Sequence, residues 1–173
     1  MSTQAAPERL AMAVDALDPR PSDHVLEVGC GHGVAVSLVC ARLVDGRMTA
    51  IDRSSAMIRA AGQRNRSHIE AGRLRLETVA LADADFGDER FDRVLAVRVG
   101  ALSRPPAEEL AVLRRHLAPG GTVGVFGDQP TPDRTAASQR DLLDNLERHG
   151  FSVVEVVNRP GATTTLVGVL ATA

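Results

Sequence analysis

The chain has 173 residues, the length of one domain, and it carries a net charge of −2. With no Trp, no Tyr and only four Phe, its core must be built mainly from aliphatic side chains. The charge balance lacks the basic excess of nucleic-acid-binding proteins, and the absence of Lys excludes mechanisms that use a lysine Schiff base or lysine general base.

The two cysteines, Cys30 and Cys40, have no metal-ligand spacing and favour a reduced compartment over a disulfide framework. Residues 1–7 lack the basic start and apolar run of a signal peptide. No apolar stretch approaches the roughly 18 residues of a membrane span. We therefore expect a cytoplasmic protein without metal and without contact to membrane or nucleic acid.

Helix-like and strand-like segments alternate along the chain. Apolar residues at helical spacing predict helices over residues 7–17, 34–43, 54–65, 105–117 and 134–149. Short apolar runs predict strands over residues 25–28, 48–51, 74–79, 91–99, 122–126, 151–157 and 163–170. This order predicts one α/β domain over residues 1–173, with an N-terminal helix in residues 1–20 and a mostly parallel sheet in the core, residues 24–173.

The first strand leads into a glycine-rich loop, the string from Glu27 to Gly33. Its glycines, Gly29, Gly31 and Gly33, permit positive φ and let a ligand approach the backbone closely. A strand, a glycine loop and a helix in that order form a nucleotide-binding crevice at the carboxyl end of a parallel sheet. The dinucleotide fingerprint requires a further glycine where Val34 stands, so the spacing disfavours a nicotinamide dinucleotide.

An acidic residue, Asp52, follows the second predicted strand. A carboxylate at this place can accept hydrogen bonds from both ribose hydroxyls of a nucleoside. Nicotinamide enzymes carry an acid at a similar distance from the loop. Asp52 therefore predicts a nucleoside ligand without choosing between cofactors.

Four motifs together resemble the class I S-adenosylmethionine-dependent methyltransferases. The string from Glu27 to Gly33 resembles motif I of that family, and residues 51–58 resemble motif II. Phe86 with residues 91–95 resembles the family's Phe-Asp strand start, and residues 117–121 resemble its Leu-Lys-Pro-Gly-Gly turn. Four motifs in order are far more specific than any one of them.

The resemblance implies a three-layer, doubly wound, Rossmann-like sheet of seven strands in the order 3-2-1-4-5-7-6, with strand 7 antiparallel. It also implies S-adenosyl-L-methionine as the cofactor and S-adenosyl-L-homocysteine as the product. Carried over residue by residue, the cofactor-binding positions are Glu27, Gly29, Cys30, Gly31, Gly33, Asp52, Arg53, Met57, Ala80, Leu81 and Val97.

Three departures from the family pattern narrow the function. Ala80 stands where the family often has an Asp that meets adenine, so adenine would rely on backbone and apolar contacts, or on Asp83 or Asp85. Residues 101–102 are Ala and Leu where many small-molecule enzymes have a His pair. Residues 96–99 replace the Asn-Pro-Pro-aromatic motif of many amino-group methyltransferases, which disfavours adenine-N6 and glutamine methylation.

Methyl transfer from a sulfonium requires chiefly that the acceptor be aligned with the methyl group. A general base is needed only when the acceptor arrives protonated. The candidates are Asp128, after the fifth strand, to orient or deprotonate the acceptor, and Arg98, after the fourth, to hold an acidic acceptor. Both are loop residues for which a structural role is the alternative. The five His form no site, and His68 is expected in a solvated loop.

The sequence thus predicts methyl transfer to a small molecule. The alternative is a non-catalytic or regulatory S-adenosylmethionine-binding protein, because the His pair and an evident lid over the site are missing. A nicotinamide oxidoreductase is disfavoured, since no Tyr is present for a proton relay. Only residues 1–20 and 127–133 are free to shape an acceptor pocket, so we expect an open site or one completed by a homodimer or partner chain.

Overall fold

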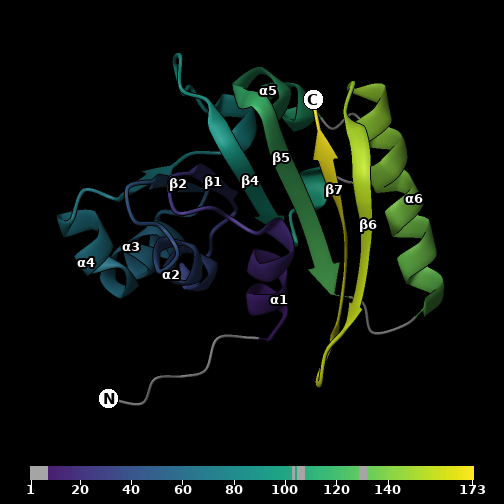
Figure 1. The fold of residues 1–173 in the computed structure, drawn as a ribbon, viewed down its shortest axis with the longest axis horizontal. Helices are drawn as coiled ribbons and strands as arrows, with labels where there is room; N and C mark the ends of the chain where they lie inside the picture. The colour runs from purple at the N-terminus through teal and green to yellow at the C-terminus, as the bar shows by residue number, and fades with distance from the viewer. Residues whose placement is uncertain (1–7, 103, 105–107, 129–131) are drawn as a thin grey trace.

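The computed structural model of the protein describes residues 8–102, 104, 108–128 and 132–173, with the backbone alone for residues 128 and 132–138. The described strands form one seven-stranded sheet in the order β3-β2-β1-β4-β5-β7-β6 (Figure 1). All neighbouring strands pair in parallel except β7, which is antiparallel to β5 and β6. The predicted fold class is confirmed. The strands are β1 (His24–Val28), β2 (Arg47–Asp52), β3 (Leu74–Thr78), β4 (Phe91–Val97), β5 (Leu117–Asp128), β6 (Ser152–Pro160) and β7 (Thr165–Thr172).

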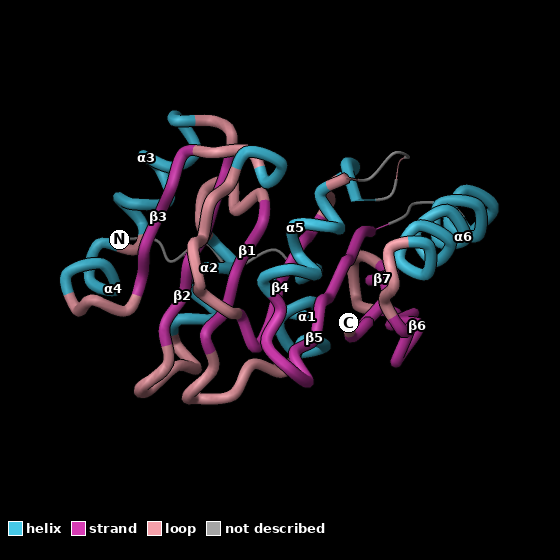
Figure 2. The backbone as a smooth tube through the Cα atoms, turned by 90° about the horizontal axis from the view of Figure 1, so that it is seen from above, coloured by secondary structure: helices cyan, strands magenta, loops and turns pink. Residues whose placement is uncertain are grey.

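Helices cover both faces of the sheet (Figures 1 and 2). The helices are α1 (Glu8–Leu17), α2 (Val34–Cys40), α3 (Ser55–Arg64), α4 (Arg66–Glu70), α5 (Glu109–His116) and α6 (Pro132–Arg148), with 3-10 turns η1 (Leu81–Asp83) and η2 (Gly100–Leu102). Buried side chains of α1, α2 and α3 form one core cluster, and those of α5 and α6 form the other. None of the helices in the described ranges is long and apolar enough to cross a membrane.

The period-two pattern of the strands divides the core between the two faces. In β1, Val25 points to the cluster with α1 and α2, whereas Leu26 points to the cluster with α5 and α6. Both side chains are fully buried. A strand covered on both faces needs apolar residues at successive positions, which explains the continuous apolar runs of the central strands.

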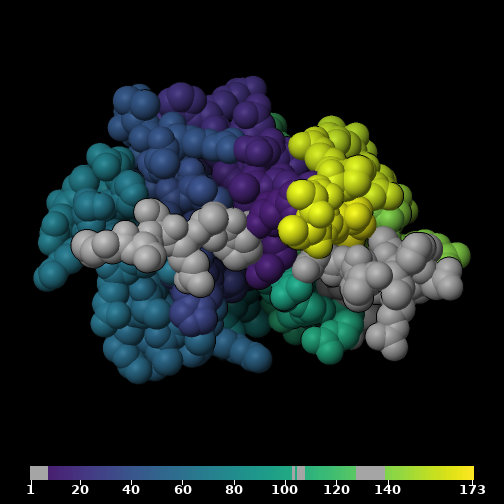
Figure 3. Space-filling view, turned by 90° about the horizontal axis from the view of Figure 1, so that it is seen from below, coloured from purple at the N-terminus to yellow at the C-terminus, as the bar shows by residue number. Residues whose placement is uncertain are grey.

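The N-terminal helix α1 is hydrogen-bonded to the turn between β6 and β7. The Glu8 carboxylate accepts hydrogen bonds from the backbone N–H groups of Ala162 (2.6 Å) and Thr163 (2.8 Å), in the turn between β6 and β7. Figure 3, which looks at the side on which β5 and β6 end, shows α1 in purple against this hairpin in yellow. The amino end of α1 therefore lies at the same edge of the sheet as the carboxyl ends of the parallel strands.

Several predicted boundaries were wrong. Helix α2 ends at Cys40 and not at residue 43, because Val44 N–H and Gly46 N–H both turn back to the Pro21 carbonyl at 2.9 Å. Strand β4 ends at Val97 and not at residue 99, because the next residue has a positive φ. Strand β5 already begins at Leu117, and the expected Pro-Gly-Gly turn lies within it as a register shift against β4.

The placement of His68 was also wrong. It lies in α4, a short helix that the sequence did not predict, and not in a solvated loop. Helix α3 stops at Asn65, whose φ of −109° and ψ of 24° are not helical. The chain then resumes helical geometry for five residues before Gly72, with φ +71°, turns it into β3.

Candidate functional site

The glycine loop is tied to the end of β2. The N–H groups of Gly29 and Cys30 both donate to the Ile51 carbonyl, at 2.8 and 3.1 Å. Gly31 has φ +52°, and a Cβ added there would meet no atom within 4 Å. Gly33 has φ +73°, and a Cβ there would lie 2.8 Å from the Ala61 Cβ. Gly33 is thus required by packing against α3, whereas Gly31 faces open space that a ligand can enter.

Asn65 locks this loop in place, a role that sequence reasoning missed. Its buried side-chain amide donates to the carbonyls of Gly33 (2.9 Å) and Ala61 (3.0 Å). Its amide oxygen accepts from the Ser37 hydroxyl at 2.6 Å. The side chain therefore joins α2, α3 and the loop. An Asn at the end of a predicted helix is so common that its type gave no signal of this role.

Asp52 organises the loop from the other side. Its Oδ2 accepts from Gly31 N–H at 3.0 Å, and its Oδ1 accepts from Ser54 N–H at 2.8 Å. An ionised carboxylate offers about four acceptor sites, so both oxygens keep capacity for a further hydrogen bond. Asp52 can therefore shape the loop and still accept from a ligand hydroxyl.

Glu27 is a buried acid beside the loop. Only 3% of its surface is exposed, and its Oε2 has no hydrogen-bond partner among the described residues. Burial, and secondarily the negative charge of Asp52, raise the pKa of Glu27 to about 8. At neutral pH this carboxyl is therefore mostly protonated. A buried polar atom without a partner is costly in a folded protein, and it marks a place where a ligand group can pair.

A cavity of about 370 Å³ opens at the carboxyl ends of the strands next to the loop. Many of the predicted cofactor-binding residues line it, drawn from the ends of four separate strands: Gly29, Asp52, Arg53, Ala80, Leu81 and Val97. The apolar part of the wall comes mainly from Val28, Ile51, Val79 and Val99. This arrangement suits a ligand with one flat apolar part and one part rich in hydroxyl groups.

The remaining predicted residues lie outside this lining. Glu27 and Cys30 are buried, Gly31 and Gly33 belong to the loop itself, and Met57 is half-buried in the first turn of α3. Neither of the acids suggested for adenine, Asp83 and Asp85, lines the cavity. The polar residues that sequence reasoning missed there are Arg104 and Glu109. They come from the segment after β4, where no family motif pointed to them.

The two residues predicted to act on the methyl acceptor lie at the ends of neighbouring strands: Arg98 follows β4, whereas Asp128 is the last residue of β5 and not the loop residue that the sequence predicted. Arg98 lines the cavity and adopts φ +60°, a conformation that non-glycine residues rarely take. Its N–H donates to the Phe126 carbonyl at 2.8 Å, which holds the end of β4 against β5. The Asp128 backbone ends β5 and pairs with Leu166, while its side chain lies outside the described part of the chain. Backbone strain at the edge of a cavity is typical of functional sites.

The thiols of Cys30 and Cys40 are both buried. Burial raises the pKa of Cys30 to about 12 and that of Cys40 to about 11. Both are free cysteines that stay protonated at neutral pH. Since the thiolate is the nucleophilic form, neither cysteine is suited to nucleophilic catalysis.

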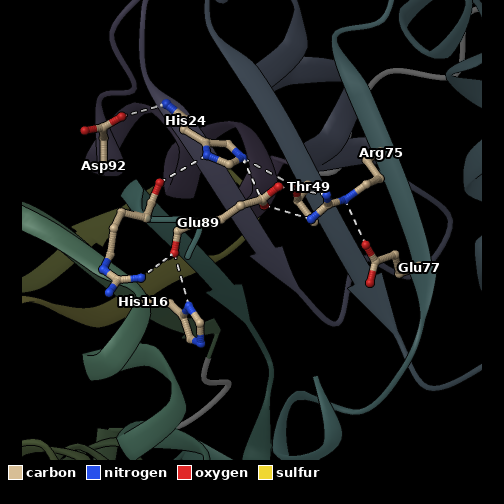
Figure 4. Close-up of polar contacts among 8 residues, drawn as sticks. His24, Thr49, Arg75, Glu77, Glu89, Asp92 and His116 are labelled. Atoms are coloured by element: carbon tan, nitrogen blue, oxygen red, sulfur yellow. Dashed lines mark hydrogen bonds and ion pairs between the residues drawn. The ribbon is translucent and has the colours of Figure 1, made fainter. Parts of the chain in front are cut away.

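The histidines serve structure rather than this cavity. His24 and His116 are buried and hold the segment before β4, through ring contacts to the carbonyls of Arg90 and Glu89 at 3.1 Å (Figure 4). Among residues 8–102, 104, 108–128 and 132–173, no three His, Cys, Asp or Glu side chains gather in a way that could hold a metal ion.

With this geometry in view, comparison with known proteins decides the family. The model of a methyltransferase-domain family matches residues 25–121. The chain belongs to the class I S-adenosylmethionine-dependent methyltransferase family. The matched range begins in β1 and ends in β5, so it contains the glycine loop, Asp52 and the lining of the cavity from Val28 to Glu109.

Individual relatives agree with this membership. The chain is 33% identical to an uncharacterized 37.1 kDa transposon protein from Streptomyces fradiae, over 86% of this chain and 45% of that protein. It is 33% identical to the nocamycin O-methyltransferase of Saccharothrix syringae, over 69% of this chain and 42% of that enzyme. The chain thus spans about half the length of these curated relatives.

Solved structures share the fold. A methyltransferase from Aquifex aeolicus superposes with a TM-score of 0.78 at 19% identity, covering 95% of this chain and 92% of that one. A geranyl diphosphate methyltransferase, solved in complex with S-adenosylmethionine, gives a TM-score of 0.73 at 16% identity, covering 94% and 84%.

Proposed function

We propose that the protein binds S-adenosyl-L-methionine and transfers its methyl group to a small molecule by in-line displacement. The observation that carries this proposal is the convergence of predicted cofactor positions from four strand ends on one cavity beside the glycine loop. The match to nocamycin O-methyltransferase supports a small-molecule acceptor. The matches also include a C-methyltransferase, so the atom methylated in this protein is left to experiment.

The residues present fit this cofactor. In the proposal, Asp52 accepts from the ribose hydroxyls with the capacity that its two backbone contacts leave free. The backbone of Ala80 and Leu81, with the apolar wall from Ile51 and Val79, holds the adenine. Glu27, mostly protonated in the unliganded protein, ionises on pairing with the ammonium group of the methionine part, because a nearby positive charge favours the carboxylate, and its buried oxygen then gains a partner.

The chemistry then rests on alignment. When bound, the cofactor supplies a methyl group already activated by its sulfonium. The protein has to hold the acceptor in line with that methyl and exclude water, and such positioning accounts for much of the acceleration. We propose that Arg98 holds an acidic acceptor and that Asp128 orients or deprotonates it, because Arg98 follows β4 and Asp128 ends β5, two strands that end at the cavity side.

One observation favours a second candidate function, a regulatory cofactor-binding protein without methyl transfer. The residues that stand in place of the His pair are Ala101 and Leu102, and the Leu102 side chain is fully buried in the core. No imidazole is therefore available at this position to act as a base.

The two functions are separated by a transfer assay. The protein is incubated with methyl-labelled S-adenosylmethionine and a pool of metabolites, and the Asp52→Ala variant serves as the control. Label in a small molecule that depends on Asp52 is the expected result. Tight cofactor binding without transfer to any compound in the pool would favour the regulatory function.

A further inference from the structure

A second cavity, of about 220 Å³, lies at the opposite edge of the sheet, where β1, β2 and β3 begin. Its polar lining consists of His24, Arg47, Thr49, Arg73, Arg75 and Glu89. Strand β2 runs from Arg47 at this cavity to Asp52 at the first one. At about 3.3 Å per residue, the two ends are about 16 Å apart, so the second cavity is separate from the proposed methyl-transfer site.

The charges around this cavity are unequal. Three guanidinium groups face a single carboxylate, that of Glu89. Both oxygens of Glu89 already accept from Arg75, at 2.9 and 2.8 Å, and the Nε of Arg75 pairs with Glu77 at 2.8 Å (Figure 4). Three cations therefore stand against two carboxylates, both of which pair with Arg75, and in the described part of the chain no carboxylate forms an ion pair with the other two cations.

Those two cations are Arg47 and Arg73. In the described part of the chain, neither forms an ion pair with a carboxylate. The Nε of Arg73 is buried and has no hydrogen-bond acceptor. The Nη2 of the same side chain lies 3.5 Å from Nδ1 of His68. A buried guanidinium N–H without an acceptor is unfavourable, so the protein alone does not satisfy the Arg73 side chain.

The imidazole of His24 is part of the same cavity lining. His24 Nδ1 lies 3.1 Å from the Arg90 carbonyl, which can only accept, so in this contact Nδ1 carries the proton. Its Nε2 lies 3.5 Å from the Thr49 hydroxyl and 4.0 Å from the Glu89 carboxylate. Burial, followed by the charge of Arg47, lowers the pKa of His24 even though Glu89 is close.

We propose that this cavity is a binding site for a phosphate-type oxyanion, either inorganic phosphate or the phosphate group of a monoester, held by Arg47 and Arg73. Guanidinium groups match the oxygens of phosphate with paired, charge-assisted hydrogen bonds. A multiply charged anion can pair with both of these guanidinium groups, neither of which forms an ion pair in the described part of the chain. Because the site lies at the edge opposite Asp52, its ligand is an effector or a stabilising ion and not the methyl acceptor.

The test is thermal unfolding of the full chain in sodium phosphate or phenyl phosphate, with ionic strength held constant by sodium chloride. Wild type should show a saturable rise in melting temperature of about 5 °C. Arg47→Gln and Arg73→Gln should raise the half-saturating phosphate concentration about tenfold or more. Arg59→Gln, at an exposed position of α3 outside the cavity, is the matched control and should behave as wild type.

The controls separate site binding from general salt effects. Phosphate stabilises most proteins by exclusion from their surface, and that effect is the same in every variant. An equal, unsaturated rise in all four proteins, or full binding by Arg47→Gln, would overturn the proposal. Arg47 is exposed, so its variant keeps the test decisive even if Arg73→Gln is unstable. Saturation by phenyl phosphate alone would assign the site to a monoester, whereas saturation by both ligands would assign it to the phosphate group itself.

Discussion

The buried carboxyl of Glu27 should make the stability of the unliganded protein fall as pH rises. Its pKa is about 8 in the folded protein, against 4.5 for an ordinary Glu. Between these two values the folded protein holds a proton that the unfolded chain has released, so each rise in pH favours unfolding. At 1.36 kcal/mol per pH unit, the loss between pH 4.5 and pH 7 is about 3 kcal/mol, and it stops growing above pH 8.

The Glu27→Gln substitution removes this penalty because an amide does not ionise. We expect the free energy of unfolding of the variant at pH 7 to exceed that of wild type by up to about 3 kcal/mol, with little difference at pH 4.5. Urea unfolding at half-unit steps from pH 4.5 to pH 8.5 measures this. Glu70→Gln, at an exposed position of α4, is the control and should follow wild type.

The same variant should bind S-adenosylhomocysteine more weakly, because the ammonium group of the ligand loses its carboxylate. Higher stability with lower affinity is the expected signature of a residue kept for binding. Wild type and Glu27→Gln with the same pH dependence of stability would refute the reasoning, since Glu27 would then be ionised in the folded protein at neutral pH.

Three further predictions concern the loop and the acceptor side. Asp52→Ala should weaken S-adenosylhomocysteine binding at least about tenfold by calorimetry, and it should also lower the melting temperature without ligand, because two backbone N–H groups lose their acceptor. Gly33→Ala should lower the free energy of unfolding, measured in urea, by about 2 kcal/mol or more, because the added Cβ would lie 2.8 Å from the Cβ of Ala61. Gly31→Ala has open space at its Cβ, so it should lower this free energy by only about 1 kcal/mol and should mainly weaken ligand binding. Asp128→Asn should leave cofactor affinity unchanged and reduce turnover about 10²-fold if Asp128 is a general base, while unchanged turnover would remove it from the site.

The sheet order could be predicted because four motifs fix the positions of β1, β2, β4 and β5 along the chain. A glycine loop after one strand and an acid after the next can lie together only at the carboxyl edge of a parallel sheet. The resemblance to the methyltransferase family added Val97 to the predicted cofactor positions, and Gly29, Asp52 and Val97 all line one cavity.

Other features depend on contacts between distant segments, which a local pattern does not encode. The strand over residues 91–99 stays apolar to its end, so the turn at Arg98 is invisible until its N–H is seen to pair with Phe126. Asn65 ends a helix like many other Asn residues, and only its proximity to Gly33 reveals its role. The second cavity was missed for the same reason, because Arg47 lies far from Arg73 in the sequence and the two are brought together only by the pairing of β2 with β3.

The central claim is that this cavity binds S-adenosylmethionine, and calorimetric titration of the wild-type protein with S-adenosylhomocysteine tests it most directly. The account predicts saturable binding of one ligand per chain with micromolar affinity, about 8 kcal/mol, and no heat from NAD under the same conditions. Tight binding of NAD with no response to S-adenosylhomocysteine would contradict it.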